Sequence, residues 1–189
     1  INEIVEHLNN EEIVKNVDKL FSAGVSVVKL VDNIIGYEET IYRAAMDKLE
    51  QKGINSEYLY GLVDVMRATS DAWTRGYDRR YCHVEQWTDG LENAVNNLSC
   101  DDETKNMIAR DMVSYTIPMM NGYEIYLRGL INKLVDLGGD RAEVSKCALR
   151  SVPVQDWEFD IFGVDGLVQQ GFDEEEVKKY AASMPDVII

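Results

Sequence analysis

The sequence predicts an all-α protein: an antiparallel bundle of about four long helices with a smaller helical cap at its C-terminal end. Apolar residues recur at steps of three and four along most of the chain, the spacing that places them on one face of a helix. Only three prolines occur in 189 residues, so helices can run a long way without interruption. We expect residues 1–151 to form the bundle and residues 152–189 to form the cap.

The first two predicted helices occupy residues 10–35 and 37–52. Asn10 is a suitable N-cap for the first of them. Its segment 24–31, GVSVVKLV, is rich in β-branched residues and could form a strand on propensity alone. The periodicity on both sides of that segment favours a helix. Gly53 is the residue type that commonly follows the end of a helix, so we expect the second helix to end there.

The longest amphipathic stretch is residues 56–98, which contain no proline. A continuous helix of this length would span roughly 65 Å. Gly76 and Gly90 each lower the helical preference by about 1 kcal/mol relative to alanine. A kink or a break at either glycine is therefore an open alternative to one straight helix.

A fourth long helix is predicted over residues 100–137, with Ser99 as its N-cap. Pro118 lies in the middle of this helix. Because proline removes a main-chain hydrogen bond and clashes with the preceding turn, we expect a kink or break there. The pair Gly138 and Gly139 ends the helix.

The C-terminal quarter of the sequence, from residue 140, predicts shorter helices. Asp140 and Asp173 are each followed three residues later by a glutamate, a pattern typical of a helix N-terminus. We expect one helix from Asp140 to about residue 150, one over 156–170, and a last one from Asp173 to about residue 183.

The charge balance limits the possible partners. The chain has 34 acidic and 19 basic residues and a formal net charge of −15. So negative a surface disfavours binding to nucleic acids and to anionic membranes, and no apolar segment is long enough to cross a bilayer. We expect a soluble cytoplasmic protein that binds neither directly. A surface that binds a basic partner is the alternative.

The three cysteines predict reduced thiols. Cys82, Cys100 and Cys147 are widely spaced and form no C-x-x-C motif, which favours a reducing compartment over a disulfide framework. One disulfide with one free thiol also fits the count. The first residues lack the basic and apolar regions of a signal peptide, in agreement with the cytoplasmic expectation.

Catalytic and metal-binding signatures are missing. There is no phosphate-binding glycine loop, no G-x-S-x-G and no H-E-x-x-H. Neither His7 nor His83 belongs to a Glu-x-x-His motif, and Cys82 and His83, as neighbours on a helix, would point about 100° apart. We therefore expect no catalytic residues, no metal and no cofactor. Four carboxylates could face the inside of the bundle, but they lack the paired spacing of a metal site: Asp32, Glu38, Asp64 and Glu124.

Basic and aromatic residues are concentrated in one segment, residues 71–89, of this acidic chain. Its aromatic residues suit a core, and its cations could pair with acidic neighbours. The alternative is a patch for an anion or a protein partner, since arginine binds carboxylate or phosphate bidentately and aromatic rings offer apolar area. The candidate binding residues are Arg75, Arg79, Arg80, His83, Trp73 and Trp87.

Together these patterns predict a non-enzymatic regulator, inhibitor or adaptor that acts through protein–protein contacts. Long amphipathic helices often pair between chains, so a homodimer is a further expectation. Two alternatives stay open. The first is a helical-bundle enzyme that binds an anionic small molecule at Arg75, Arg79, Arg80 and His83. The second is an acidic mimic of nucleic acid.

Overall fold

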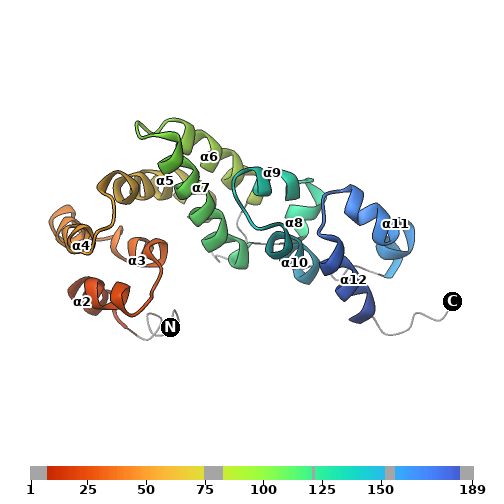
Figure 1. Ribbon diagram of the computed structural model, residues 1–189, viewed down its shortest axis with the longest axis horizontal. Helices are drawn as coiled ribbons and strands as arrows, with labels where there is room; N and C mark the ends of the chain where they lie inside the picture. The colour runs from red at the N-terminus through yellow and green to blue at the C-terminus, as the bar shows by residue number, and fades with distance from the viewer. Residues whose placement is uncertain (1–7, 75–82, 121, 152–155, 184–189) are drawn as a thin grey trace.

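The computed structural model describes residues 8–74, 83–120, 122–151 and 156–183, and within them the all-α prediction is confirmed (Figure 1). These residues form α-helices and one 3-10 turn, with no strand. The molecule is elongated, and its helices follow one another along the long axis from the N-terminal to the C-terminal side (Figure 1).

The helices are short compared with the prediction. In chain order they are α2 (Asn10–Ser22), α3 (Val27–Ile34), α4 (Glu39–Gln51), α5 (Ser56–Thr74), α6 (Val84–Asn96), α7 (Asp102–Thr116), the 3-10 turn η2 (Ile117–Met119), α8 (Gly122–Leu127), α9 (Ile131–Asp136), α10 (Arg141–Ser151), α11 (Asp156–Gln169) and α12 (Glu174–Ser183).

The predicted helix over residues 10–35 is wrong, because the chain turns between α2 and α3. Gly24 takes a φ of +92°, a left-handed conformation that ends a helix and that glycine adopts without a Cβ clash. Ser26 then caps α3, its side chain accepting from the N–H of Lys29 at 3.3 Å. The strand alternative for this segment is wrong as well. The N-cap of α2 is Asn9, one residue before the predicted Asn10.

The second predicted helix is confirmed as α4. Its end is marked by Gly53, whose N–H donates to the carbonyl of Glu50 at 2.8 Å. Lys48 of α4 also donates to the main-chain carbonyl of Lys15 in α2, at 2.9 Å. This bond lies beside a kink in α2 at Asn16, where φ is −116° and ψ is 18°.

The single helix predicted over residues 56–98 is also wrong. His83, the residue before α6, has a ψ of 88°, which is not helical. The two helices α5 and α6 on either side of residues 75–82 instead pack against each other. The alternative break at Gly90 does not occur, because Gly90 lies inside α6. The predicted break at Gly76 lies outside the described residues.

The break predicted at Pro118 is confirmed. α7 ends at Thr116, and Pro118 lies in η2 before the chain continues into α8. The Cys147 thiol of α10 donates a hydrogen bond to the carbonyl of Ile117 at 3.0 Å. The predicted N-cap at Ser99 is wrong: Asp101 caps α7 and accepts from the N–H of Thr104 at 2.7 Å.

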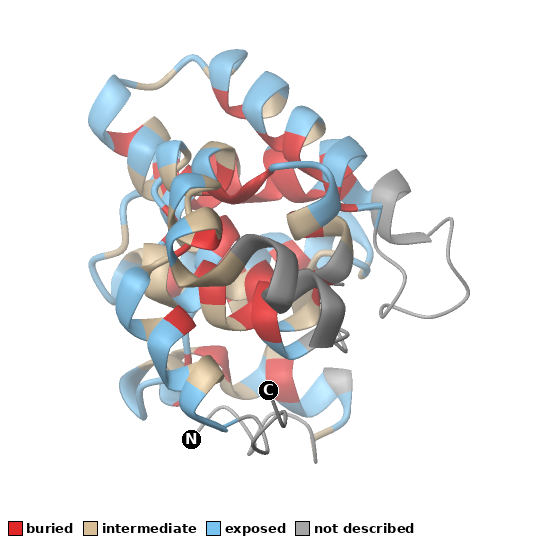
Figure 2. Cartoon of the chain, turned by 90° about the vertical axis from the view of Figure 1, so that its right-hand side faces the viewer, coloured by how far each residue is buried: buried red, intermediate tan, exposed pale blue. Residues whose placement is uncertain are grey.

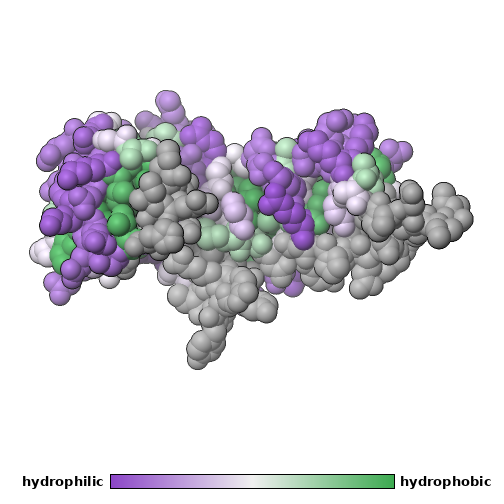
Figure 3. All heavy atoms as spheres, turned by 90° about the horizontal axis from the view of Figure 1, so that it is seen from below, coloured by the Kyte–Doolittle hydropathy of each residue, from purple (hydrophilic) through white to green (hydrophobic). Residues whose placement is uncertain are grey.

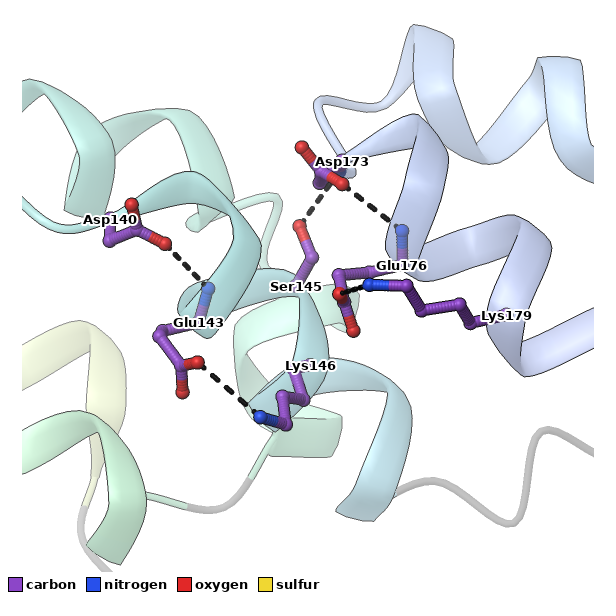
Figure 4. A network of polar contacts seen from close by, with 7 residues as sticks. All are labelled: Asp140, Glu143, Ser145, Lys146, Asp173, Glu176 and Lys179. Atoms are coloured by element: carbon purple, nitrogen blue, oxygen red, sulfur yellow. Dashed lines mark hydrogen bonds and ion pairs between the residues drawn. The ribbon is translucent and has the colours of Figure 1, made fainter.

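Figure 4 shows how the C-terminal helices are capped and joined. Both predicted N-caps are confirmed, since Asp140 accepts from the N–H of Glu143 and Asp173 from that of Glu176, each at 3.0 Å. The N–H of Asp173 in turn donates to the hydroxyl of Ser145 at 2.8 Å. Ser145 is fully buried on α10, so this bond fixes the start of α12 against α10.

Most helices contact helices that are close in the sequence. α2 packs on α3 and α4, α5 on α6 and α7, and α10 on α8, α9 and α12. Buried segments lie where helices face one another, and exposed segments lie on their outer sides (Figure 2). The four long helices of the prediction are therefore replaced by shorter ones that stack in chain order.

Two tyrosines join α7 to earlier helices. The hydroxyl of Tyr115 donates to Asp32 of α3 at 2.7 Å, and that of Tyr58 in α5 donates to Asp111 at 2.8 Å. Burial and the hydrogen bond to Asp111 raise the pKa of Tyr58 well above its ordinary value. The phenol therefore stays protonated and keeps its hydrogen bond.

Candidate functional site

The predicted basic and aromatic cluster is only partly within the described residues. Arg75, Arg79 and Arg80 lie outside them. Trp73 belongs to the last turn of α5, and His83 is the exposed residue that precedes α6. The anion or partner site at these positions therefore stays a prediction.

Trp87 is the largest fully buried side chain among the described residues. It lies in α6, and its indole N–H has no hydrogen-bond partner in the described part of the chain. The side chain contributes apolar area to the core, as expected for the aromatic residues of the predicted cluster. Its predicted contact with a partner stays untested.

Two basic residues, one in the turn after α8 and one in α9, form ion pairs with acidic residues of α6. Arg128 contacts Glu85 at 3.2 Å, and Lys133 contacts Asp89 at 2.6 Å and Glu92 at 3.0 Å. Hydrogen bonds to Asp89 and Glu92 raise the pKa of Lys133. These pairs, partly exposed, add little stability individually, but they fix which side of α6 faces α8 and α9.

Beyond these pairs, a groove opens between the C-terminal half of α6, the N-terminal half of α7 and the end of α9. Its volume is about 840 Å³. We call it the α6–α7–α9 groove. Its lining is formed by Glu92, Val95, Asn96, Glu103, Asn106, Met107, Ala109, Arg110, Asp136, Leu137 and Gly138.

The groove combines an apolar part with exposed carboxylates. Val95 is buried, and Met107 and Leu137 are half-buried. Glu103 and Asp136 are exposed, and neither carboxylate forms an ion pair with any described residue. A cation that entered the groove would therefore find two carboxylates that no described cation neutralises.

The one cation in the groove lining is already engaged. Arg110 contacts the carboxylate of Asp111 at 3.0 Å, the same carboxylate that accepts from Tyr58. Lys133, which lies next to the groove, is engaged by Asp89 and Glu92. The groove therefore keeps a negative surplus, and an anionic ligand would meet repulsion there.

The end of the groove depends on a close approach between Gly138 and α7. Gly138 has a φ of +95°, and a Cβ built on it would lie 2.9 Å from the Cβ of Arg110. Its N–H donates to the carbonyl of Val135, and the N–H of Gly139 donates to that of Leu134, both at 2.9 Å. These two bonds close the last turn of α9, so the turn places Asp136 beside α7.

Sequence reasoning did not find this groove. The signal in the sequence is a polar stripe on α7, through Glu103, Asn106 and Arg110, at the three- and four-residue spacing of one helix face. Such stripes are ordinary on solvated helices. The stripe becomes one wall of a groove because the C-terminal half of α6 and the turn at Gly138 lie beside it.

The carboxylates proposed to face inward do not come together. Asp32 accepts from Tyr115 and Glu124 from the N–H of Val84, whereas Glu38 and Asp64 are exposed. Within the described ranges, no group of three or more histidine, cysteine, aspartate and glutamate residues could hold a metal ion.

The described cysteines are free, and one of them is poorly suited to be a nucleophile. Cys100 and Cys147 form no disulfide. Burial raises the pKa of Cys147 to about 11, which keeps its thiol protonated at neutral pH, whereas a nucleophilic cysteine needs a lowered pKa. Cys82, whose pairing with His83 was considered, lies outside the described residues.

Comparison with models of protein families finds no match to this chain, and comparisons with curated proteins and with solved structures find none either. In the part of the chain that the structure describes, no helix combines the length and the apolar character needed to cross a membrane.

Proposed function

We propose that this protein is a non-enzymatic adaptor or regulator that binds a protein partner through the α6–α7–α9 groove. The observation that supports this function is the groove itself, which offers about 840 Å³ beside two carboxylates without a described ion-pair partner.

The surface favours a polar partner over an apolar one. Among the described residues, the only exposed large hydrophobic side chains are Ile41 on α4 and Leu127 on α8. On the face drawn in Figure 3, hydrophobic atoms form separate areas between hydrophilic ones. A partner that binds by burying one broad apolar patch fits this surface less well than one that binds through charges and hydrogen bonds.

We further propose that residues 152–189 act as a helical cap on a bundle formed by residues 1–151. The hydrogen bond from Asp173 to the buried Ser145 supports a firm attachment of α12. A homodimer and a cytoplasmic location complete the proposal, and the free thiols of Cys100 and Cys147 suit the latter. Native mass spectrometry of the purified protein tests the dimer.

The partner is tested by affinity capture from a lysate with three baits, followed by mass spectrometry. They are the wild type, the groove variant Glu103→Gln/Asp136→Asn and the control Glu57→Gln/Asp64→Asn. The control removes the same charge at two exposed positions of α5 outside the groove lining. We expect one protein to be retained by the wild type and the control but lost by the groove variant.

Equal capture by all three baits would place the partner elsewhere on the surface. Capture of no protein by the wild type would contradict the proposed function. A partner that normally binds DNA or RNA, displaced from the bait by added nucleic acid, would favour the acidic mimic instead.

A further inference from the structure

We propose that the α6–α7–α9 groove binds a short segment of the partner that carries both basic and apolar side chains. This inference rests on the proposed function, since it names the chemistry of the partner.

The expected charge of the bound segment follows from which charged groups in and beside the groove already form ion pairs. Arg110 is engaged by Asp111, and Lys133 by Asp89 and Glu92. Glu103 and Asp136 have no such partner among the described residues, and they line the groove from α7 and from the end of α9. Lysine or arginine side chains entering between these two walls would complete two ion pairs.

The apolar character of the bound segment follows from the apolar side chains that line the same groove as those carboxylates. Met107 and Leu137 are half-buried and line the groove with the buried Val95. A lysine or arginine can lay its aliphatic stem on such a surface while its charged end reaches a carboxylate. Methionine also adapts its shape to different apolar partners. A free inorganic cation would use none of this area.

A peptide segment also suits the amides and the volume. Asn96 and Asn106 line the groove and are exposed, and their side chains can both donate to and accept from the main chain of a bound segment. The volume of about 840 Å³ lies in the range of roughly 300–1,000 Å³ found for ligand pockets. It accommodates a few residues rather than a folded domain.

Fluorescence anisotropy with labelled decapeptides tests the inference on the full chain. The probes are an alternating lysine–leucine peptide, a lysine–glycine peptide of equal charge and a glutamate–leucine peptide. We expect the lysine–leucine peptide to bind the wild type most tightly and the glutamate–leucine peptide not to bind. Glu103→Gln/Asp136→Asn should weaken binding of the first by about tenfold, a modest loss because exposed ion pairs contribute little each.

The control Glu57→Gln/Asp64→Asn should change the affinity by less than about twofold, because screening in salt limits the reach of distant charges. Circular dichroism melting curves would verify that both variants stay folded. Equal weakening by both variants would overturn the inference in favour of diffuse attraction to an acidic surface. Equal affinity for the lysine–leucine and lysine–glycine peptides would overturn the inference that the bound segment carries apolar side chains. A lysine–leucine peptide that does not bind would overturn the whole inference.

The outcome is separable from that of the proposed function. If no lysine–leucine peptide binds but the groove variant still loses a captured partner, the groove binds a partner of different chemistry and only this inference fails. If the peptide binds in the groove but no protein is captured from a lysate, the site has the stated chemistry and the proposed function fails.

Discussion

The carboxylate of Glu124 in α8 accepts a hydrogen bond from the main-chain N–H of Val84 at 3.0 Å. Val84 is the first residue of α6, and His83 before it provides no side-chain cap. Glu124 therefore satisfies an N–H that the helix itself leaves unpaired, and its negative charge lies at the positive end of the helix dipole. A residue distant in the sequence here replaces a local N-cap.

Removing this cap should destabilise the protein. We expect Glu124→Ala to lower the free energy of unfolding by about 1 kcal/mol, as loss of an N-cap does, and Glu124→Gln to cost less because its amide oxygen can still accept. Urea denaturation measures both. Glu38→Ala is the matched control, since Glu38 precedes α4 but makes no capping hydrogen bond. Equal effects at Glu38 and Glu124 would contradict the assignment.

The attachment of α12 should depend on Ser145. Ser145→Ala leaves the N–H of Asp173 without its acceptor, and we expect a loss of about 1–3 kcal/mol. The loss should be local, so hydrogen exchange should accelerate in α12 before α5. Ser183→Ala is the control, because Ser183 is exposed at the end of α12. Unchanged exchange in α12 would show that other contacts hold it.

The turn at Gly138 should tolerate no side chain. Gly53 has a similar φ of +90°, but a Cβ there would meet nothing within 4 Å. We expect Gly53→Ala to cost about 1 kcal/mol from conformational strain alone. Gly138→Ala should cost roughly 1–3 kcal/mol more, because its Cβ would press on Arg110. Thermal and urea unfolding compare the two, and equal costs would refute the close approach.

Stability should fall in alkaline solution. Burial raises the pKa of Cys147 from 9.0 to about 11, and the pKa of Tyr58 is raised in the same direction. The folded state therefore holds these protons more tightly than the unfolded state. The contribution of Cys147 is complete below pH 9 and is lost as the pH rises to about 11. The contribution of Tyr58 is complete below its ordinary pKa of 10 and starts to be lost only above that pH.

Urea midpoints between pH 7 and 11 measure this loss. Cys147→Ala should reduce the pH dependence while lowering stability at pH 7, since the thiol also donates to the carbonyl of Ile117. A midpoint that stays constant or increases up to pH 11 would contradict the prediction.

Sequence patterns predicted which residues are helical better than where the helices turn. The break at Pro118 was predictable because proline cannot donate a main-chain hydrogen bond. The break at Gly24 was not, because apolar spacing continues on both sides of it and the same residue type, at Gly90, lies inside a helix. The two glycines differ in the backbone conformation that the packing around each of them requires.

The groove was not predictable for a related reason. The ends of α7, η2 and α8 lie between Glu103 and Asp136 in the chain. Their common place in the groove lining depends on the turns at Pro118 and Gly129 and on the close approach of Gly138 to Arg110. Periodicity assigns each residue to a face of its own helix, but it contains no information about which faces meet.

The distance along the sequence between contacting helices also affects how the chain folds. Contacts between helices close in sequence require little loop-closure entropy, so such chains fold quickly. The hydrogen bond between Tyr115 and Asp32 joins residues 83 positions apart, and forming it requires the intervening helices to be in place. We expect the local helix pairs to form first and the α3–α7 junction to form late, as the step that completes the packing of α3 against α7.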